Sequence, residues 1–221
     1  MEATAKVPLR RARERELVAA TRRLFDERGM QHAPVEEIAQ AAGIARGLIY
    51  RQFSSKEELY VLTVVDYLDE LEGELAAATA DARDPAVKLE RCAETYAAFC
   101  ERYPAFLDSA LALMQRPARD LSDSVSESVW LRLGRSMAAC VARLAQVLRD
   151  GVKAGEFEIE DPDYMANLLW TQTLGAMHLA RIRVGIRRTE AGEPDLFRVE
   201  PTQVVRSCVE TAMSGLGKPP R

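Results

Sequence analysis

The sequence contains 221 residues, of which 48% are hydrophobic and 29% are charged, and its formal net charge is −4. The length predicts one domain or two small ones, and the composition excludes a wholly disordered chain and a disulfide-dense miniprotein. Residues 1–60 hold 11 Lys and Arg against 9 Asp and Glu, so they carry a net charge of +2 and the rest carries −6. The chain is therefore not basic throughout, and only its first part has the charge that favours nucleic acid.

Cysteine and histidine usage argues against a metal site. The four cysteines, Cys92, Cys100, Cys140 and Cys208, include no Cys-X-X-Cys pair, and the chain has two histidines. We therefore expect no metal and no cofactor, with the thiols buried as small apolar groups. The sequence shows no secretory leader and no run of 18 apolar residues, so we expect a cytoplasmic protein without a membrane partner.

Helical periodicity extends over most of the chain, with glycine and proline at the joins, and predicts an all-α fold of about nine helices. The expected helices span residues 9–28, 35–42, 45–52, 55–81, 84–103, 105–115, 120–153, 161–184 and 201–216. Ser55 and Glu58 have the spacing of a capping box, and Asp84-Pro85 and Asp161-Pro162 are typical of an N-cap followed by a first-turn proline.

Two short helices meet at Gly43 within the segment Pro34–Phe53. A sharp turn between helices needs a residue that tolerates positive φ, and glycine does so without strain. Ala39, four residues before the turn, is small enough to let the second helix cross closely, and Ile49, six residues after it, can fill the crossing. A small residue, a glycine and an apolar residue at this spacing are typical of a helix-turn-helix.

The second short helix has one apolar edge and one cationic flank. On a helical wheel Ile49 and Phe53 lie close together, which predicts that they pack inward. The outer flank consists of Gly47, Leu48, Tyr50 and Arg51. Such a flank suits the DNA major groove, where Arg51 can reach a base edge or a phosphate and Gly47 allows close backbone approach. Arg46 lies nearer the apolar edge, but it is in the first turn and its side chain can still reach DNA.

The helix-turn-helix belongs to a longer pattern of residues. The pattern comprises Ile38-Ala39, Ala41-Ala42-Gly43-Ile44, Gly47, Tyr50-Arg51, Phe53 and Ser55-Lys56-Glu57. Over about residues 9–60 it closely resembles the tetracycline-repressor (TetR) family of bacterial transcription regulators, and the remaining chain is similar to that family in helix number, length and order. The resemblance implies a homodimer that places two helix-turn-helix units in successive major grooves of a palindromic operator.

The resemblance also implies roles for individual side chains. The DNA-binding site it implies is Arg46, Gly47, Leu48, Tyr50, Arg51 and Lys56. Arg46, Leu48 and Arg51 would face bases or nearby phosphates, and Tyr50 would bond a phosphate. Lys56 would hold a phosphate at the N-terminus of the fourth helix, where helix amides and a lysine together attract anions. A packing role for Tyr50 and a solvated position for Arg51 or Lys56 are the alternatives.

Two positions depart from the family pattern. Ala45 stands where the family often has a Ser or Thr cap, and Gln52 stands where an aromatic residue or His is common. The operator sequence of another member therefore cannot be carried over to this chain. The arginines between Arg10 and Arg15 either form a solvated face or contact a phosphate, since cations at a helix N-terminus oppose the helix dipole.

Two apolar stripes on the helix over residues 161–184 predict that it is buried on two sides. We expect its small-residue stripe and the last helix to form a four-helix bundle with a second copy of the chain, as the resemblance also implies. The expected interface is Leu169, Thr173, Ala176, Ala180, Val205, Cys208, Val209 and Ala212. The other stripe is expected to face a pocket for a mainly apolar effector.

The expected pocket takes large apolar residues from several helices. Its lining is Phe99, Tyr103, Trp130, Met137, Trp170, Leu174, Met177 and His178. His178 or Arg181 is the candidate polar anchor for the ligand. The alternative for each pocket residue is an ordinary position in the hydrophobic core. For His178 the alternative is a buried histidine whose ring nitrogens are hydrogen-bonded within the core.

These expectations divide the chain into three parts. Residues 1–54 are expected to form the helix-turn-helix DNA-binding domain of three helices, and residues 55–216 the helical effector-binding and dimerisation domain. Residues 185–199 are expected to form a mobile polar loop, and residues 217–221 a disordered tail.

We predict a ligand-responsive transcriptional repressor that binds a palindromic double-stranded DNA operator as a homodimer and is released by a mainly apolar small molecule. An activator or a ligand-independent regulator of the same fold is one alternative, and an all-helical carrier of small molecules without specific DNA binding is another. We expect no enzyme, because the sequence has no phosphate-binding glycine loop and no evident nucleophile–base arrangement.

Overall fold

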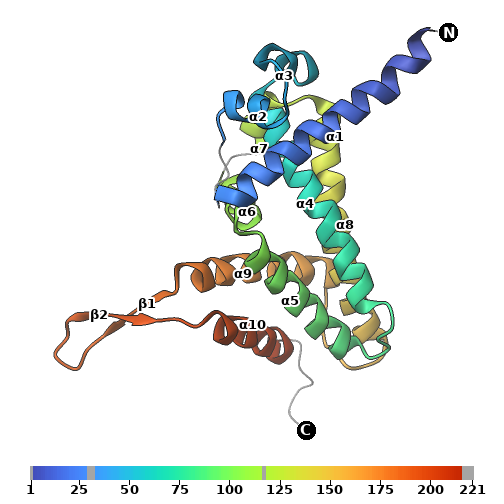
Figure 1. Ribbon diagram of the computed structural model, residues 1–221. Helices are drawn as coiled ribbons and strands as arrows, with labels where there is room; N and C mark the ends of the chain where they lie inside the picture. The colour runs from blue at the N-terminus through green and yellow to red at the C-terminus, as the bar shows by residue number, and fades with distance from the viewer. Residues whose placement is uncertain (1, 29–32, 116–117, 216–221) are drawn as a thin grey trace. The chain divides into compact units, whose positions relative to one another are not determined.

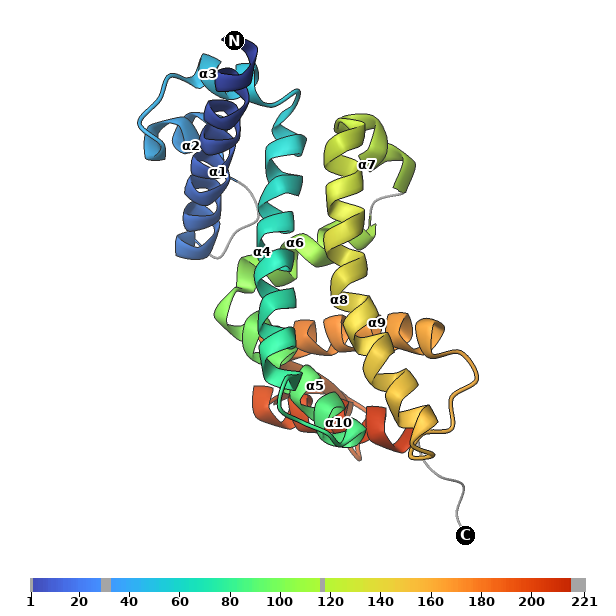
Figure 2. The same ribbon diagram turned by 90° about the vertical axis from the view of Figure 1, so that its right-hand side faces the viewer.

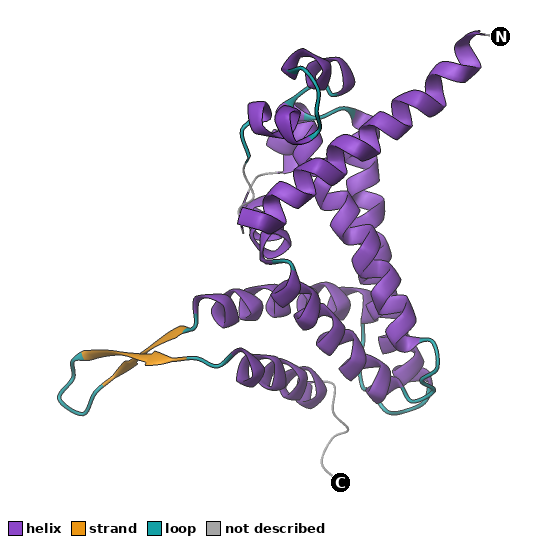
Figure 3. Ribbon diagram, in the orientation of Figure 1, coloured by secondary structure: helices purple, strands orange, loops and turns teal. Residues whose placement is uncertain are grey.

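The computed structural model describes residues 2–28, 33–115 and 118–215, and over these residues it contains ten helices and one two-stranded sheet (Figures 1 and 2). The helices are α1 (Glu2–Arg28), α2 (Val35–Ala41), α3 (Arg46–Gln52), α4 (Lys56–Thr79), α5 (Pro85–Arg102), α6 (Pro104–Gln115), α7 (Ala118–Ser124), α8 (Glu127–Lys153), α9 (Pro162–Ile182) and α10 (Pro201–Gly215). The strands β1 (Val184–Arg188) and β2 (Pro194–Arg198) form a hairpin between α9 and α10 (Figure 3). The expected helical fold class is confirmed, and the tail 217–221 lies outside the described residues.

The chain forms two compact units. Unit 1 comprises Met1–Glu70 and Tyr103–Met137, and unit 2 comprises Leu71–Arg102 and Ala138–Arg221. Helices α4 and α8 each contribute their first part to unit 1 and their second part to unit 2. The unit that contains the helix-turn-helix therefore extends past the domain boundary expected after residue 54.

Amphipathic helix faces form the core, as the apolar periodicity predicts. The stripe of α4, which is Leu59, Leu62, Val65, Leu68, Leu71 and Leu75, is buried along its whole length. The expected caps of α5 and α9 are confirmed. The carboxylate of Asp84 accepts a hydrogen bond from the amide of Ala86 at 2.7 Å, and that of Asp161 accepts one from the amide of Tyr164 at 2.9 Å.

The single helix expected over residues 120–153 is two helices, because the chain leaves helical geometry at Val125 and Ser126. The carbonyl of Ser126 accepts hydrogen bonds at 3.0 Å from the amides of Val129 and Trp130 and so begins α8. The hydroxyl of Ser126 donates to Glu58, which lies 68 residues away in the sequence. Short polar side chains compete with the helical backbone for hydrogen bonds, and this non-local bond favours the break.

The segment expected as a mobile loop, residues 185–199, forms a β-hairpin instead. Its strands pair antiparallel with Ile186 opposite Leu196. The turn contains Gly192 at φ +88°, a conformation that favours glycine, and the amide of Gly192 donates to the carbonyl of Thr189 at 2.9 Å. Charged residues interrupt the apolar alternation of both strands, so the period of two is weak in the sequence and the prediction of a loop was wrong.

The start of α4 follows the expected capping box only in part. The amide of Glu58 donates to the hydroxyl of Ser55 at 3.0 Å, as expected. The carboxylate of Glu58, however, accepts from the amide and hydroxyl of Ser54 at 2.5 and 2.8 Å rather than from the amide of Ser55, and it also accepts from Ser126. Burial alone would raise the pKa of Glu58, but the hydrogen bonds from Ser126 and Ser54 outweigh it and lower the pKa.

We expect Glu58→Gln to destabilise unit 1, because this buried side chain loses the charge that accepts hydrogen bonds from Ser54 and Ser126. The free energy of unfolding should fall by about 1.5–3 kcal/mol at neutral pH. A carboxyl whose pKa is lowered by folding stabilises the protein above its ordinary pKa, and this stabilisation is lost as the pH falls. The deficit should therefore shrink as the pH falls below about 4.3, the ordinary pKa of glutamate. Denaturant unfolding of wild type and Glu58→Gln at a series of pH values measures this difference in the free energy of unfolding.

Glu57→Gln is the matched control, because Glu57 is the neighbouring residue in α4 and is half-buried. Its free energy of unfolding should stay within about 0.5 kcal/mol of wild type. Equal deficits for the two variants, or a Glu58→Gln deficit that does not change with pH, would contradict the assigned role of Glu58.

Candidate nucleic-acid interface and effector cavity

Gly43 makes the turn between α2 and α3, as predicted. Its φ is +65°, which a residue with a side chain rarely adopts, and the amide of Ile44 donates to the carbonyl of Ala39 at 2.9 Å. Ala39 and Ile49 are both buried, which confirms the expected close crossing of the two helices. The turn therefore sets the direction in which α3 leaves α2.

The two sides of α3 differ as the helical wheel predicts. Ile49 and Phe53 are buried, and α3 packs against α1 and α2. The exposed residues of α3 and its start are Arg46, Gly47, Tyr50 and Arg51, while Leu48 is half-buried. No atom outside the local backbone lies within 4 Å of the position that a Cβ on Gly47 would take. The outer flank of α3 is thus open, partly cationic and free of bulk at Gly47.

Arg46 and Lys56 are both held beside tyrosine rings. The guanidinium of Arg46 forms an ion pair with Glu36 at 2.6 Å and lies 5.6 Å from the centre of the Tyr50 ring. Interaction with Tyr50 and the charge of Glu36 raise the pKa of Arg46. The ammonium of Lys56 lies 4.9 Å from the centre of the Tyr60 ring, at the first residue of α4. Contacts within unit 1 therefore hold Arg46 at the start of α3 and Lys56 at the start of α4.

An arginine at the centre of unit 1 joins α1 to α4. The guanidinium of Arg22 pairs with Asp66 at 2.7 Å and with Glu70, and it lies 4.2 Å from the centre of the Tyr67 ring and 4.7 Å from that of Tyr103. Burial alone would lower the pKa of Arg22, but the hydrogen bonds and charges of Asp66 and Glu70 raise it. The sequence analysis missed this cluster, although Asp66 and Glu70 lie four residues apart on α4 and so share one side of that helix.

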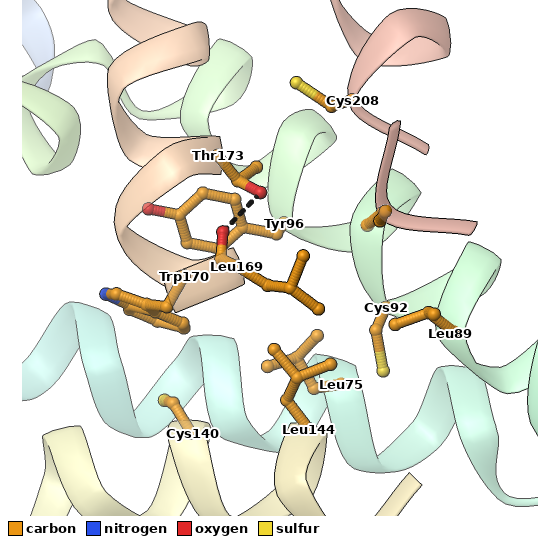
Figure 4. Close-up of a pocket in the computed structure, with 12 residues that line it drawn as sticks. Leu75, Leu89, Cys92, Tyr96, Cys140, Leu144, Leu169, Trp170, Thr173 and Cys208 are labelled. Atoms are coloured by element: carbon orange, nitrogen blue, oxygen red, sulfur yellow. Dashed lines mark hydrogen bonds between the residues drawn. The ribbon is translucent and has the colours of Figure 1, made fainter. Parts of the chain in front are cut away.

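Unit 2 contains a small apolar cavity (Figure 4). It is lined by Leu75, Leu89, Cys92, Ala93, Tyr96, Cys140, Leu144, Leu169, Trp170, Thr173, Cys208 and Ala212, and its volume is about 50 Å³. The rings of Tyr96 and Trp170 lie 4.8 Å apart, and the Thr173 hydroxyl donates to the Leu169 carbonyl at 2.8 Å. Burial raises the pKa of Cys92 to about 11, so this thiol is neutral at pH 7. The walls therefore offer apolar atoms, sulfur and aromatic faces.

The structure divides the eight expected pocket residues between the two units, and their role in effector binding stays a prediction. Trp170 lines the cavity, while Phe99, Leu174 and Met177 are buried away from it. The remaining four are distributed as follows: Met137 and His178 are exposed, Trp130 is half-buried in unit 1, and Tyr103 donates to Glu70 in unit 1. A helical wheel identifies an apolar stripe on a helix but not the element against which that stripe packs. On α9 the stripe expected at the dimer interface supplies Leu169 and Thr173 to the cavity, whereas the stripe expected at the pocket supplies Trp170.

The expected dimer residues divide between this cavity and a groove on α9 and α10. Leu169, Thr173, Cys208 and Ala212 line the cavity. Leu169, Thr173, Ala176 and Cys208 also line the groove, whose volume is about 430 Å³. Ala180 is buried, and Val205 and Val209 are half-buried on α10. The groove also includes Phe197 and Val199 at the base of the hairpin.

The residues that the structure describes contain no cluster of three or more His, Cys, Asp or Glu side chains that could hold a metal ion. Among them, no helix is long and apolar enough to cross a membrane.

Comparison with known proteins decides the family. Residues 17–62 match the sequence profile of bacterial regulatory proteins of the tetR family. The transcriptional repressor KstR2 of Rhodococcus jostii is 32% identical over 146 residues, which cover 66% of this chain and 68% of KstR2. The chain belongs to the TetR family.

A second relative and a solved structure are also consistent with membership of the TetR family. The transcriptional activator FasR of Mycolicibacterium smegmatis is 32% identical over 89 residues, which cover 40% of this chain and 41% of FasR. The structure of the regulator FadR from Bacillus subtilis in complex with stearoyl-CoA has the same fold, with a TM-score of 0.66, 13% identity, and coverage of 90% of this chain and 97% of FadR. As a TetR-family protein, the chain is a DNA-binding transcriptional regulator that responds to a ligand.

The two positions that depart from the TetR pattern have structural consequences. Ala45 precedes α3 and makes no side-chain cap, as expected from its methyl group. The amide of Gln52 donates to the carbonyl of Arg10 at 3.0 Å and so ties the end of α3 to α1. The local geometry of this TetR-family helix-turn-helix is thus maintained by a contact that the sequence analysis did not predict.

Proposed function

We propose that this TetR-family protein is a repressor that binds a palindromic operator as a homodimer and is released by a mainly apolar small molecule. The observation that carries the proposal is the open flank of α3, which faces away from a buried edge of Ile49 and Phe53. The proposed DNA contacts are Arg46, Gly47, Leu48, Tyr50, Arg51 and Lys56. Two copies of α3 would enter successive major grooves, about 34–36 Å apart.

The groove on α9 and α10 supports the proposed homodimer. Small residues there, such as Ala176, permit close approach of helices from a second copy, and Val205 and Val209 supply half-buried apolar area on α10. The proposed interface is Leu169, Thr173, Ala176, Ala180, Val205, Cys208, Val209 and Ala212. Those of its residues that also line the cavity would connect dimer contacts to ligand binding.

The cavity of unit 2 supports an apolar effector. At about 50 Å³ it has room for a few water molecules but not for a larger ligand, so binding must push helices apart. Stearoyl-CoA in the FadR structure makes a fatty acyl thioester the first candidate to test. His178 is exposed and away from the cavity, so a polar anchor is expected instead from the hydroxyl of Thr173 or Tyr96.

Helix α4 offers a physical route from ligand to DNA. Leu75 lines the cavity, and Asp66 and Glu70 of the same helix pair with Arg22 of α1. We propose that a ligand displaces α4 and with it α1, so that the spacing of the two copies of α3 no longer matches one turn of DNA.

The proposal locates this regulator in the cytoplasm, where free thiols such as the buried Cys92, Cys100 and Cys140 stay reduced, and it assigns the protein no enzymatic activity.

An activator of the same fold is the second candidate, because the relative FasR is a transcriptional activator. A transcription assay distinguishes a repressor from an activator. The operator, once it has been selected from a random DNA pool, is placed either upstream of a promoter or over it, and the protein either lowers or raises transcription.

Salt-dependent DNA binding tests the proposed DNA contacts. Selection from a random pool should return a palindromic operator, and Arg51→Ala should bind it about tenfold more weakly or worse. Because each protomer loses one contact to DNA, the slope of log K against log salt should become shallower by about 1 per protomer if that contact is to a phosphate. Gel shift over a series of salt concentrations measures both effects.

Arg135→Ala is the control for this experiment, because Arg135 is an exposed arginine of α8 in the same unit. It should leave affinity and salt slope close to wild type. Equal losses for Arg51→Ala and Arg135→Ala would contradict docking through α3.

A cavity-filling variant tests the effector site. Ala93→Leu adds apolar volume inside the cavity at an expected cost of about 1–3 kcal/mol in stability. We expect it to bind operator like wild type but to need a concentration of fatty acyl-CoA about tenfold higher for release, in a titration of the operator complex. Ala98→Leu, on the exposed side of the same helix, should respond like wild type. If both variants respond like wild type to a ligand that releases the parent protein, the effector binds elsewhere.

A further inference from the structure

The β-hairpin between α9 and α10 has one uncovered apolar face. Ile186 and Leu196 are directly opposite each other in the register and are 75% and 67% exposed. Val184, two residues from Ile186 and so on the same side of the ribbon, is exposed as well. Figures 1 and 3 show the hairpin extending beyond the ends of α9 and α10, with no other part of unit 2 over it. We call Val184, Ile186 and Leu196 the aliphatic face.

The opposite face of the hairpin is closed by its own side chains. Arg187 pairs with Asp195 at 2.7 Å, and its guanidinium lies 5.8 Å from the centre of the Phe197 ring. The Phe197 ring covers Gly185 so closely that a Cβ there would lie 2.3 Å from it. The ribbon therefore has a defined twist and register. A two-stranded ribbon is marginally stable alone in water, and an exposed apolar strand tends to pair with other chains, so the aliphatic face needs a cover.

Basic side chains accompany the aliphatic face. The alternation of the strands puts Arg188 and Arg198 on the same side as Ile186 and Leu196. Arg188 donates to the carbonyl of Gly192 at 3.0 Å, and Arg198 pairs with Glu200 at 2.6 Å. Both arginines are exposed, so a surface that covers this face must combine apolar area with negative charge.

The approach to α9 has this combination. The acidic residues Glu156, Glu158, Glu160, Asp161 and Asp163 fall within eight positions that contain no Lys or Arg. Next to them Tyr164 is 65% exposed, which is unusual for a large aromatic side chain. Asp163 pairs with Arg149 at 2.9 Å and Asp161 caps α9, while Glu158 and Glu160 are exposed. We call residues 156–164 the acidic patch.

The hairpin and the acidic patch of one chain lie at opposite ends of α9. The 21 residues of α9 span about 31 Å, and the hairpin continues away from its C-terminal end. In a dimer with a two-fold axis perpendicular to α9, the two copies of α9 run antiparallel, so the C-terminal end of each lies beside the N-terminal end of the other. The groove on α9 and α10 already reaches the base of the hairpin through Phe197 and Val199.

We propose that the hairpin is an exchanged arm, whose aliphatic face covers Tyr164 of a second copy of this chain and whose Arg188 and Arg198 face the acidic patch of that copy. The proposal rests on the homodimer proposed above and extends its interface past the helical bundle. Each dimer contains this contact twice, because a two-fold interface is isologous.

Reversal of charge tests the arm. In the full-length protein, Arg188→Glu and Glu160→Arg should each weaken the dimer by about tenfold, because each places like charges in contact. The double variant Arg188→Glu/Glu160→Arg should return to within about threefold of wild type, since the pair is restored with its signs exchanged. Analytical ultracentrifugation gives the dimer dissociation constants, and a loss caused by misfolding would not be rescued.

Two controls separate the arm from the bundle. Glu94→Arg reverses an exposed acid on α5 and should not change dimerisation. Ala176→Glu, in the α9 and α10 groove, should give monomers that keep the helical circular dichroism of wild type. A monomeric wild-type protein would overturn the proposed dimer. A dimeric wild type with a monomeric Ala176→Glu, but with dissociation constants unchanged by Arg188→Glu and Glu160→Arg, would overturn the arm alone.

Discussion

The orientation of α3 depends on the burial of Ile49 and Phe53, and the direction of the flank proposed to contact DNA depends on that orientation. A helix of seven residues is too short to be stable by itself in water, so packing against α1 and α2 holds α3 in place. Gly43 sets the angle between α2 and α3, and Gln52 ties the end of α3 to α1. Once the apolar edge is buried, the flank that contains Gly47 has to face outward.

A second constraint acts through α4, which supplies residues to both units. The guanidinium of Arg22 joins α1 to α4 through its ion pairs with Asp66 and Glu70. These contacts are the ones through which, in the proposed mechanism, a movement of α4 would reach α1. Leu75 of the same helix lines the cavity. The proposed response to a ligand depends on these contacts alone, because α4 contains both the cavity residue Leu75 and the two carboxylates, Asp66 and Glu70, that pair with Arg22 of α1.

Local signals predicted most of the fold, and non-local contacts account for what the sequence analysis missed. The turn at Gly43, the caps at Asp84 and Asp161 and the buried edge of α3 follow from neighbouring residues and were correct. The break before α8 depends on Ser126 meeting Glu58, 68 residues away, which no local pattern shows. The expected pocket residues differ from those that line the cavity because α9 has two apolar stripes, and an apolar stripe suits a cavity, a core or a partner helix equally well. The hairpin was missed because its charged residues mask the alternation.

Alanine in place of Gly47 tests most directly whether the outer flank of α3 lies against DNA. Neither Gly47 nor the exposed Gly134 of α8 has an atom from outside its local backbone within 4 Å of the position that a Cβ would take, so both Gly→Ala variants should fold and gain about 0.5–1 kcal/mol of helix stability. We predict that only Gly47→Ala weakens operator binding, by about tenfold, since a lost base-pair contact costs about 1–3 kcal/mol. Melting temperatures and operator dissociation constants of both variants provide the test. A Gly47→Ala protein that is more stable than wild type and binds the operator as tightly as Gly134→Ala would contradict docking through this flank.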